Sequence, residues 1–299
     1  ELWPNMLCAV KERGIPAALV NARLSEKSFG RWRFAGRHIR HVLESFNVIF
    51  AQTEKDAGFF RRLGAQNVQA NGNLKYCADL LPYDPAALAA FKVATQNRLL
   101  WLYASTHDGE EDLACRVHKT LKEKIPALLT IIVPRHPERG AAVKAICEKH
   151  GLTARQRNGG NLPESQDDIY IGDTLGEMGV FYRAAPVACI GRSFSLDGGG
   201  GHNPIEAAQL GCAVLHGPHV QNLAAIYEEM DESGAALPVR NEAELRARLA
   251  ELLRDQEMMR SLQTGADSFL RNKERILETI MAGLAPMIPK TENGEAACG

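Results

Sequence analysis

The stretch PVACIGRSFSLDGGGGHNPIEAAQLGCAVLHGP, residues 186–218, decides the fold of this chain. Two short apolar runs, VACI and AVLH, flank a glycine-rich loop and a segment with helical spacing, which is the pattern of a strand, a helix and a second, parallel strand. Strands that helices cover on both faces are continuously apolar, as these two are. The stretch therefore predicts one unit of a parallel α/β sheet.

The same alternation of apolar runs and helical segments continues through the chain in two series. Residues 76–97 separate the series, and because they carry two prolines and no strand-like run, we interpret them as a linker. The predicted strands are 17–22, 47–52, 68–73, 99–105, 128–134, 167–173, 186–191 and 213–218, and the predicted helices are 32–45, 54–63, 109–124, 138–150, 175–184, 204–210 and 221–230. We expect two Rossmann-like, doubly wound α/β domains.

Composition and charge exclude several classes of protein. The chain has 299 residues, of which 45% are hydrophobic, and 35 basic residues balance 36 acidic ones, so no nucleic-acid partner is expected. Its seven cysteines include no C-x-x-C pair, which favours free thiols in a reducing compartment. The longest apolar runs are too short to cross a bilayer.

Polar residues follow five successive predicted strands. Ligands of parallel sheets bind at the carboxyl ends of the strands, where the strand order reverses. These segments read STHDGEE (105–111), PRHPER (134–139), DTLGEM (173–178), GRSFSLDGGGGHNPIE (191–206) and HGPHVQN (216–222). The sequence therefore predicts a ligand site along this edge of the second sheet.

The glycine loop leads directly into a predicted helix. Pro204 suits the first helical position and Asn203 the N-cap, so the free N–H groups there favour a phosphate. Residues Gly198 to Gly201 present no Cβ to a ligand, and Glu206 is placed to accept both hydroxyls of a ribose. The alternative interpretation is a capping box, in which Glu206 reaches back to the Asn203 amide.

Arg135 follows an apolar strand, where a guanidinium can grip a phosphate or a base edge. The alternative is an ion pair with Glu138 or another nearby acid. His136 and His202 are given no catalytic role, because a lone histidine is more often a hydrogen-bonded structural residue. His107 and the two glutamates after it lack the ligand pattern of a metal site, so no metal is predicted.

The stretch KSFGRWRFAGRHIRH, residues 27–41, combines basic and aromatic residues without an acid. Arg31, Trp32, Arg33 and Arg37 fit an anionic lipid surface or an acidic acceptor, and the same residue types also fit a nucleic-acid strand. A solvated helix face is the alternative interpretation.

Taken in order, the motifs ELWPN, NARLS, GNLK, STHDGEE, PRHPER, DTLGEM and GGHNPIEAA resemble the Kdo transferases of lipopolysaccharide synthesis over about residues 1 to 280. That family consists of GT-B glycosyltransferases that move 3-deoxy-D-manno-octulosonic acid (Kdo) from CMP-Kdo to the lipid A precursor. The resemblance implies two Rossmann-like domains facing across a cleft, inversion, and neither metal nor cofactor. It also implies a place on the cytoplasmic face of the bacterial inner membrane, at the surface of the inner leaflet.

The resemblance also implies site residues. Lys75 would stabilise transition-state charge, Glu1 matches the second glutamate of an E-T-E-L-W-P-N motif, and Arg31, Trp32, Arg33 and Arg37 would contact acceptor or membrane. The catalytic base and the anchor segment would lie upstream of residue 1, so this chain alone is expected to bind CMP without transferring sugar. The implied CMP site comprises Pro134, Arg135, Leu175, Gly176, Glu177, Asn203, Pro204, Ile205 and Glu206.

We expect residues 1–85 to be the C-terminal part of an incomplete, acceptor-side first domain. Residues 86–285 would form the CMP-sugar-binding domain with terminal helices, and 286–299 a disordered tail. The sequence departs from the family at GRSF, where G-G-S-L is usual, and in a longer glycine loop, so Arg192 is expected to alter that loop. Two alternatives stay open: a GT-B transferase of a UDP-sugar, and a nucleotide-binding module without catalysis.

Overall fold

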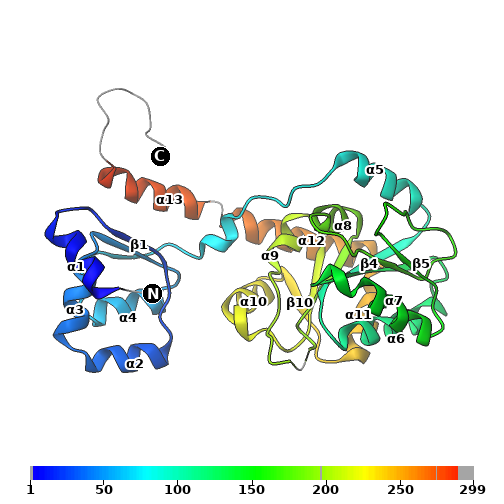
Figure 1. The fold of residues 1–299 in the computed structure, drawn as a ribbon, viewed down its shortest axis with the longest axis horizontal. Coiled ribbons are helices and arrows are strands. Elements are labelled where there is room, and N and C mark those ends of the chain that lie inside the picture. Colours follow the sequence, from blue (N-terminus) through cyan, green and yellow to red (C-terminus); the bar gives the residue numbers. More distant parts are fainter. Residues whose placement is uncertain (1–2, 196, 274, 289–299) are drawn as a thin grey trace. The chain divides into compact units, whose positions relative to one another are not determined.

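The computed structural model describes residues 3–195, 197–273 and 275–288, and it divides into two compact units (Figure 1). The first unit contains the chain up to Ala78 and again from Asn272, and the second runs from Asp79 to Arg271. Each unit has a parallel sheet, which confirms the predicted α/β class with two parallel sheets.

The first unit is built on a three-stranded parallel sheet in the order β1-β2-β3. Its sheet pairs Ala18 with Val48 and Ile49 with Val68. The elements are α1 (Pro4–Glu12), β1 (Ala18–Ala22), α2 (Glu26–Phe34), α3 (Arg37–Leu43), β2 (Val48–Ala51), α4 (Glu54–Arg62), β3 (Val68–Ala70), the 3-10 turn η1 (Leu74–Cys77), α13 (Arg275–Leu284) and η4 (Ala285–Met287).

Strand β2 is buried on both faces, and this explains why α13 belongs to the first unit. Ile49 and Ala51 join the core made with helices α1 to α4. Phe50 lies against α13, where a Cβ on Gly283 would stand 2.6 Å from the Phe50 ring. The expected boundaries at 85 and 285 therefore differ from the observed division, because this packing carries the last helix back to the first sheet. Most of the expected tail, 289–299, lies outside the described residues.

The second unit holds a seven-stranded parallel sheet in the order β10-β9-β8-β4-β5-β7-β6. Its elements are α5 (Pro85–Ala94), β4 (Leu99–Thr106), α6 (Glu110–Lys122), β5 (Leu128–Pro134), η2 (Pro137–Arg139), α7 (Gly140–Lys149), β6 (Ala154–Gln156), β7 (Ile169–Ile171), α8 (Met178–Ala184), β8 (Val187–Ile190), α9 (Ile205–Gln209), β9 (Ala213–His216), η3 (Gln221–Leu223), α10 (Ala224–Glu232), β10 (Ala236–Pro238), α11 (Glu242–Leu252) and α12 (Gln256–Arg271).

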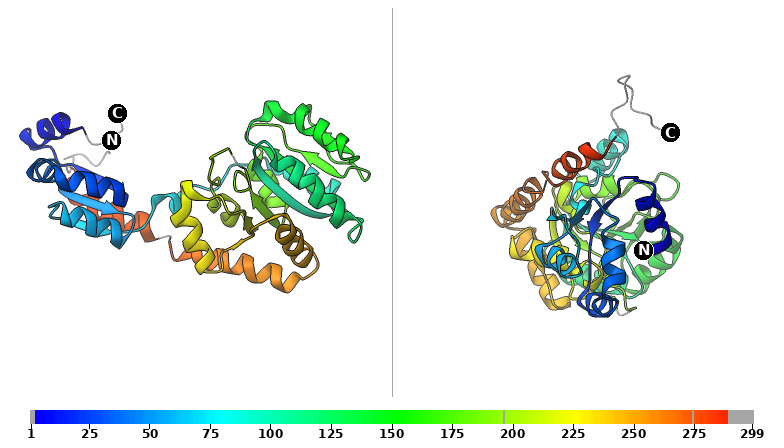
Figure 2. Two further views of the ribbon diagram at one scale, coloured as in Figure 1. Left: turned by 90° about the horizontal axis from the view of Figure 1, so that it is seen from below. Right: turned by 90° about the vertical axis from the view of Figure 1, so that its left-hand side faces the viewer.

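Helices cover both faces of this sheet, as a doubly wound domain requires. Figure 1 shows α5, α8, α9 and α12 on one side of the strands and α6, α7 and α11 on the other. In the left view of Figure 2, α7 (green) and α12 (orange) lie at opposite edges of the unit. Trp101 and Tyr103 are fully buried toward α6, while Phe91, Tyr170 and Phe181 form an aromatic cluster that joins α5, β7 and α8.

All eight predicted strands are present, and the differences concern short or interrupted elements. The structure adds the edge strands β6 and β10 and places α5 within the predicted linker. The predicted helix 32–45 is instead two helices, because Gly36 adopts a φ of 50° between them. In the part of the chain that is described, no helix has the length and hydropathy needed to cross a membrane.

Candidate functional site

The strand order of the second unit reverses beside β4, which has β5 on one side and β8 on the other. From β4 the chain builds outward through β5 to β6 and β7 and then returns to β8. In parallel sheets such a reversal opens a crevice beyond the carboxyl ends of the two central strands. The loops that follow β4 and β8 therefore form the centre of the candidate site.

Glu110, in the first turn of α6, joins these two loops. Its side chain is buried, with 1% of the residue exposed. Oε2 accepts the backbone N–H groups of His107 at 2.9 Å and Arg192 at 2.7 Å, and Oε1 accepts that of Phe194 at 3.0 Å. Hydrogen bonds to an ionised carboxylate are stronger than neutral ones. Glu110 therefore fixes the start of the glycine loop to the end of β4.

Glu111 is also buried, and its partners leave its carboxylate unavailable to Arg135. Its carboxylate accepts the Thr106 hydroxyl at 2.8 Å and the Arg139 guanidinium at 2.6 Å. The alternative ion pair of Arg135 is not formed: Glu138 lies 3.8 Å from the His136 ring instead, and the buried Glu111 is taken by Arg139. Among the described residues, no carboxylate lies within 4 Å of the Arg135 guanidinium.

Two histidines and one aspartate stand together between the loops after β4 and β8. His107 Nε2 lies 2.9 Å from His202 Nε2, and His107 Nδ1 lies 3.2 Å from Asp197 Oδ2. Burial and the charges of His107, Arg135 and Arg192 lower the pKa of His202 to about 4. Burial and Arg192 also lower the pKa of His107. Both imidazoles are therefore neutral near pH 7.

Arg135 lies at the same edge of the sheet as this cluster. Its backbone N–H donates to the Thr106 carbonyl at 3.0 Å, just after the buried Pro134 that ends β5. Its positive charge is one cause of the low His202 pKa, so the guanidinium is close enough to act on that ring. The side chain is exposed. The structure thus brings Arg135 and the loop after β8 to one place.

Backbone conformation explains the composition of the glycine loop. Gly201 has a φ of 72°, and a Cβ there would stand 2.9 Å from the Tyr227 ring. A Cβ on Gly199 would stand 2.2 Å from the Arg192 side chain, which packs over it. Arg192 itself has a φ of 60°, a backbone conformation that residues other than glycine rarely adopt. The departure from G-G-S-L therefore places a cation in a strained position in the loop, where it pairs with Asp197 at 3.4 Å.

The N-P-I-E stretch caps its helix differently from either interpretation of the sequence. Asn203 Oδ1 accepts the Ile205 N–H at 3.2 Å, and helix α9 begins at Ile205, with Pro204 as its N-cap. Glu206 accepts the side-chain amide of Asn203 at 3.1 Å instead of the backbone amide. The two predicted ligand residues are therefore held together, and both are half-buried.

The segment after β7 also reaches this edge, but its carboxylate already has a partner. Leu175 is 85% exposed and Gly176 has a φ of 82°. Glu177 forms a forked ion pair with Arg157, with a shortest distance of 2.7 Å, and accepts the Thr174 hydroxyl. Arg157 is the main cause that lowers the pKa of Glu177. A ligand at this position would meet the backbone and Leu175 before the Glu177 carboxylate.

Lys75 belongs to the first unit, in η1, and its side chain is exposed. Asn73 Oδ1 accepts the Lys75 N–H at 3.0 Å and so starts this turn. Asn21, whose φ is 58°, accepts the neighbouring Leu74 N–H at 3.1 Å. The GNLK and NARLS motifs therefore hold one another in place. Glu1 lies outside the described residues.

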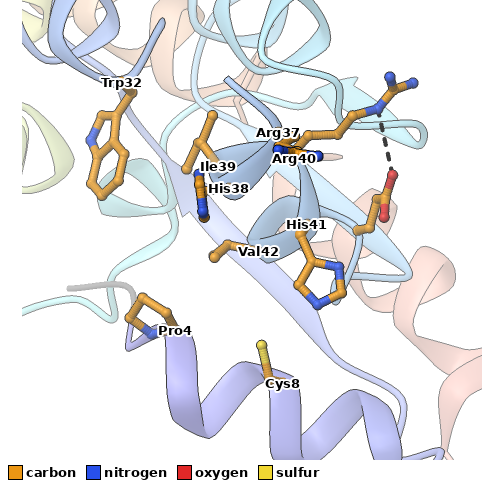
Figure 3. A pocket seen from close by; sticks show the side chains of 10 residues that line it. Pro4, Cys8, Trp32, Arg37, His38, Ile39, Arg40, His41 and Val42 are labelled. Atoms are coloured by element: carbon orange, nitrogen blue, oxygen red, sulfur yellow. Dashed lines mark ion pairs between the residues drawn. The ribbon is translucent and has the colours of Figure 1, made fainter. Parts of the chain in front are cut away.

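The basic and aromatic stretch forms α2 and α3, and it lines a cavity of about 660 Å³ in the first unit (Figure 3). Pro4, Cys8 and Trp32 contribute its apolar wall, and Arg37 and His38 contribute basic groups. Trp32 is 39% exposed, and the predicted contact residues Arg31, Arg33 and Arg37 are all exposed. Basic and apolar side chains are therefore available together on this surface.

Sequence reasoning missed Glu110 as a backbone anchor and Asp197 as the partner of His107. The sequence did contain a signal for Glu110: one acid in the first turn is enough to interact with the helix dipole, so a second adjacent glutamate indicates a further role. Asp197 gave no signal, because its role depends on how the loop folds. In the described part of the chain, no group of three or more His, Cys, Asp or Glu side chains is placed to hold a metal ion.

Comparison with known proteins gives similarity along almost the whole chain. A family model described as 3-deoxy-D-manno-octulosonic-acid transferase (kdotransferase) matches residues 1–78. Proteins with the same name are similar in Rickettsia felis, with 33% identity over 93% of this chain and 60% of that protein, and in Haemophilus influenzae, with 31% identity over 97% and 68%. The chain thus spans about 60% of the length of the first of these relatives.

Two solved structures show a similar fold. The C-terminal CMP-Kdo binding domain of WaaA from Acinetobacter baumannii matches with 27% identity and a TM-score of 0.58, over 62% of this chain and 99% of that domain. The Anabaena protein Alr3699/HepE in complex with UDP matches with 11% identity and a TM-score of 0.56, over 95% of this chain and 76% of that protein. The second likeness concerns the fold alone.

Proposed function

Because this chain belongs to the 3-deoxy-D-manno-octulosonic acid transferase family, we propose that it is part of a glycosyltransferase that moves Kdo from CMP-Kdo to the lipid A precursor, and that its second unit binds the CMP-sugar. In this reaction an acceptor hydroxyl attacks the anomeric carbon of Kdo and CMP leaves, with inversion and without a metal. The observation that carries the proposal is the match to a solved CMP-Kdo binding domain over 99% of that domain.

The proposed CMP site follows the carboxyl ends of β5, β7 and β8. Arg135 would bind the phosphate, since its guanidinium has no carboxylate partner among the described residues. Glu206 would accept ribose hydroxyls, since its hydrogen bond to Asn203 occupies only one of its carboxylate oxygens. The remaining proposed contacts are Pro134, Leu175, Gly176, Glu177, Asn203, Pro204 and Ile205.

Isothermal titration of the full chain with CMP and with UDP tests this assignment. We expect CMP to bind more tightly than UDP. Arg135→Ala and Glu206→Ala should each lower the affinity for CMP by about tenfold or more, because each removes a charged hydrogen bond. Arg260→Ala, an exposed arginine on α12, is the matched control and should leave the affinity unchanged. A preference for UDP would select a UDP-sugar transferase, and no nucleotide binding by folded protein would refute the donor site.

The first unit is proposed to serve the acceptor side. Arg31, Trp32, Arg33 and Arg37 would contact the acceptor or the anionic surface of the inner leaflet, at the cytoplasmic face of the bacterial inner membrane. Co-sedimentation with vesicles that contain anionic lipid should fall when Arg31 and Arg33 are changed to glutamate, and it should not fall for neutral vesicles. Lys75 is proposed to stabilise transition-state charge, so Lys75→Ala should leave CMP binding by this chain unchanged while lowering turnover of the full-length enzyme.

A further inference from the structure

The contact between His107 and His202 requires that one ring donates and the other accepts. Their Nε2 atoms are 2.9 Å apart, and a hydrogen bond between two nitrogens holds one proton. Asp197 Oδ2 lies 3.2 Å from His107 Nδ1, and this carboxylate favours the proton on Nδ1, which leaves the lone pair of His107 on Nε2. His202 must then donate its Nε2–H. The remaining lone pair of this three-residue chain is therefore on His202 Nδ1.

His202 Nδ1 is in position to take up a proton. Among the described residues, no hydrogen bond uses this atom. The His202 carbonyl accepts the Tyr227 hydroxyl at 2.6 Å, and the next residue, Asn203, starts the N-P-I-E segment. Tyr227 therefore holds the backbone of His202 and His107 holds its ring, while the free Nδ1 belongs to the loop proposed to hold the nucleotide.

The charges around the pair keep it neutral until an anion arrives. Burial and three neighbouring positive or potentially positive groups oppose a proton on His202 and lower its pKa. A phosphate held by Arg135 and Arg192 would cancel their charges and favour an imidazolium. The charged and titratable groups that face the pair are Asp197 and Arg192 from the loop after β8, Glu110 from α6, Arg135 and His136 from the loop after β5, and Tyr227 from α10.

We propose that His202, with its tautomer set by His107 and Asp197, takes up a proton when the phosphoryl group of a nucleotide binds at the ends of β4 and β8, and then donates its Nδ1–H to that group. This inference rests on the proposed function, since it assumes a nucleotide at this edge. It adds a recognition role for His202 and a positioning role for His107 and Asp197. Because the complex binds more protons than the free protein, affinity increases as the pH falls.

The experiment uses a ligand whose own charge does not change. CMP ionises a second time near pH 6, so we choose cytidine 5′-(methyl phosphate), which keeps one negative charge. The full chain is titrated calorimetrically at about pH 5.5 and about pH 7.5, in buffers with different ionisation enthalpies, which counts the protons taken up. We expect a net uptake approaching one proton and a tighter complex at the lower pH, by up to about tenfold per pH unit.

Variants separate a titrating role from a structural one. His202→Gln keeps a donor toward His107 without a titrating ring, and it should lose the proton uptake and the pH dependence. His150→Gln, on a histidine paired with Asp112 at 3.0 Å, is the matched control and should keep both. Cytidine, which lacks the phosphate, should show no uptake.

The outcomes are distinct. Binding of the methyl ester by wild-type protein without proton uptake would overturn this inference and leave the proposed function intact, and this result does not depend on any variant folding. Uptake that persists in folded His202→Gln would also overturn it. Failure of the ester to bind at either pH would refute the proposed function, and the inference with it.

Discussion

Replacing Glu110 with glutamine should release the glycine loop from the end of β4. The carboxylate accepts three backbone N–H groups, two on Oε2 and one on Oε1. A glutamine offers one acceptor oxygen, and if that oxygen keeps the donors at His107 and Arg192, its NH₂ faces the N–H of Phe194. One buried donor then loses its acceptor, which costs about 1–3 kcal/mol, and the two remaining bonds lose their charge assistance.

We therefore expect Glu110→Gln to lower the free energy of unfolding by about 2–3 kcal/mol in urea denaturation. Hydrogen exchange should accelerate in peptides that cover residues 191–194, and CMP affinity should fall because the loop that carries Asn203 and Glu206 is less ordered. Glu148→Gln, on the exposed end of α7, is the control and should change stability by less than about 0.5 kcal/mol. Unchanged exchange at 191–194 in Glu110→Gln would refute the role of this carboxylate as an anchor.

Three further predictions concern the same unit. Gly191→Ala should cost about 3 kcal/mol, because its Cβ would stand 2.3 Å from a backbone oxygen of β4, whereas Gly198→Ala, in open space at a φ of 77°, should cost about 1 kcal/mol of backbone strain; urea denaturation compares them. Burial lowers the pKa of His118 to about 4, so the unfolded chain, with a pKa near 6.5, binds the proton first as the pH falls. Stability should then decrease between about pH 6.5 and 4 by up to about 3 kcal/mol, and His118→Asn should flatten that slope in denaturation measured across pH. Arg157→Ala should raise the pKa of Glu177, since the guanidinium is the main cause that lowers it, and NMR titration of the carboxyl group measures this.

The long strands could be predicted from the sequence because a run of consecutive apolar residues indicates a strand that is buried on both faces. Strand β4 begins with six consecutive apolar residues, and six of the seven residues of β5 are apolar; both strands are almost entirely buried in the structure. The edge strand β6 reads only Ala-Arg-Gln, and nothing in three half-buried residues distinguishes it from a loop. Helix α5 was misinterpreted as linker, although Asp84 accepts the Ala86 N–H at 2.8 Å and Pro85 follows it, which is a standard helix start.

The sequence predicted the position of the candidate site in the fold, but it did not predict which residues of the site form hydrogen bonds and ion pairs with one another. Polar residues after successive strands must meet at one edge of a parallel sheet, so the position of Arg135 near the N-P-I-E segment followed from topology. The partners did not follow, because they join residues far apart in the chain. Arg157 takes Glu177 across 20 positions, and Glu110 accepts the Arg192 amide across 82.

The distribution of partners at this edge explains why an anion is the expected ligand of a chain with almost no net charge. The two buried acids beside the crevice are saturated, Glu110 by backbone N–H groups and Glu111 by Thr106 and Arg139. Neither can neutralise Arg135, which stays without a carboxylate within 4 Å among the described residues. Burial is the main cause of the low pKa of His202, and the positive charge of Arg135 adds to it, because a ring near a cation resists a further positive charge. A phosphate supplies the missing negative charge to both residues at once, so Arg135→Ala should also raise the pKa of His202 in the free protein.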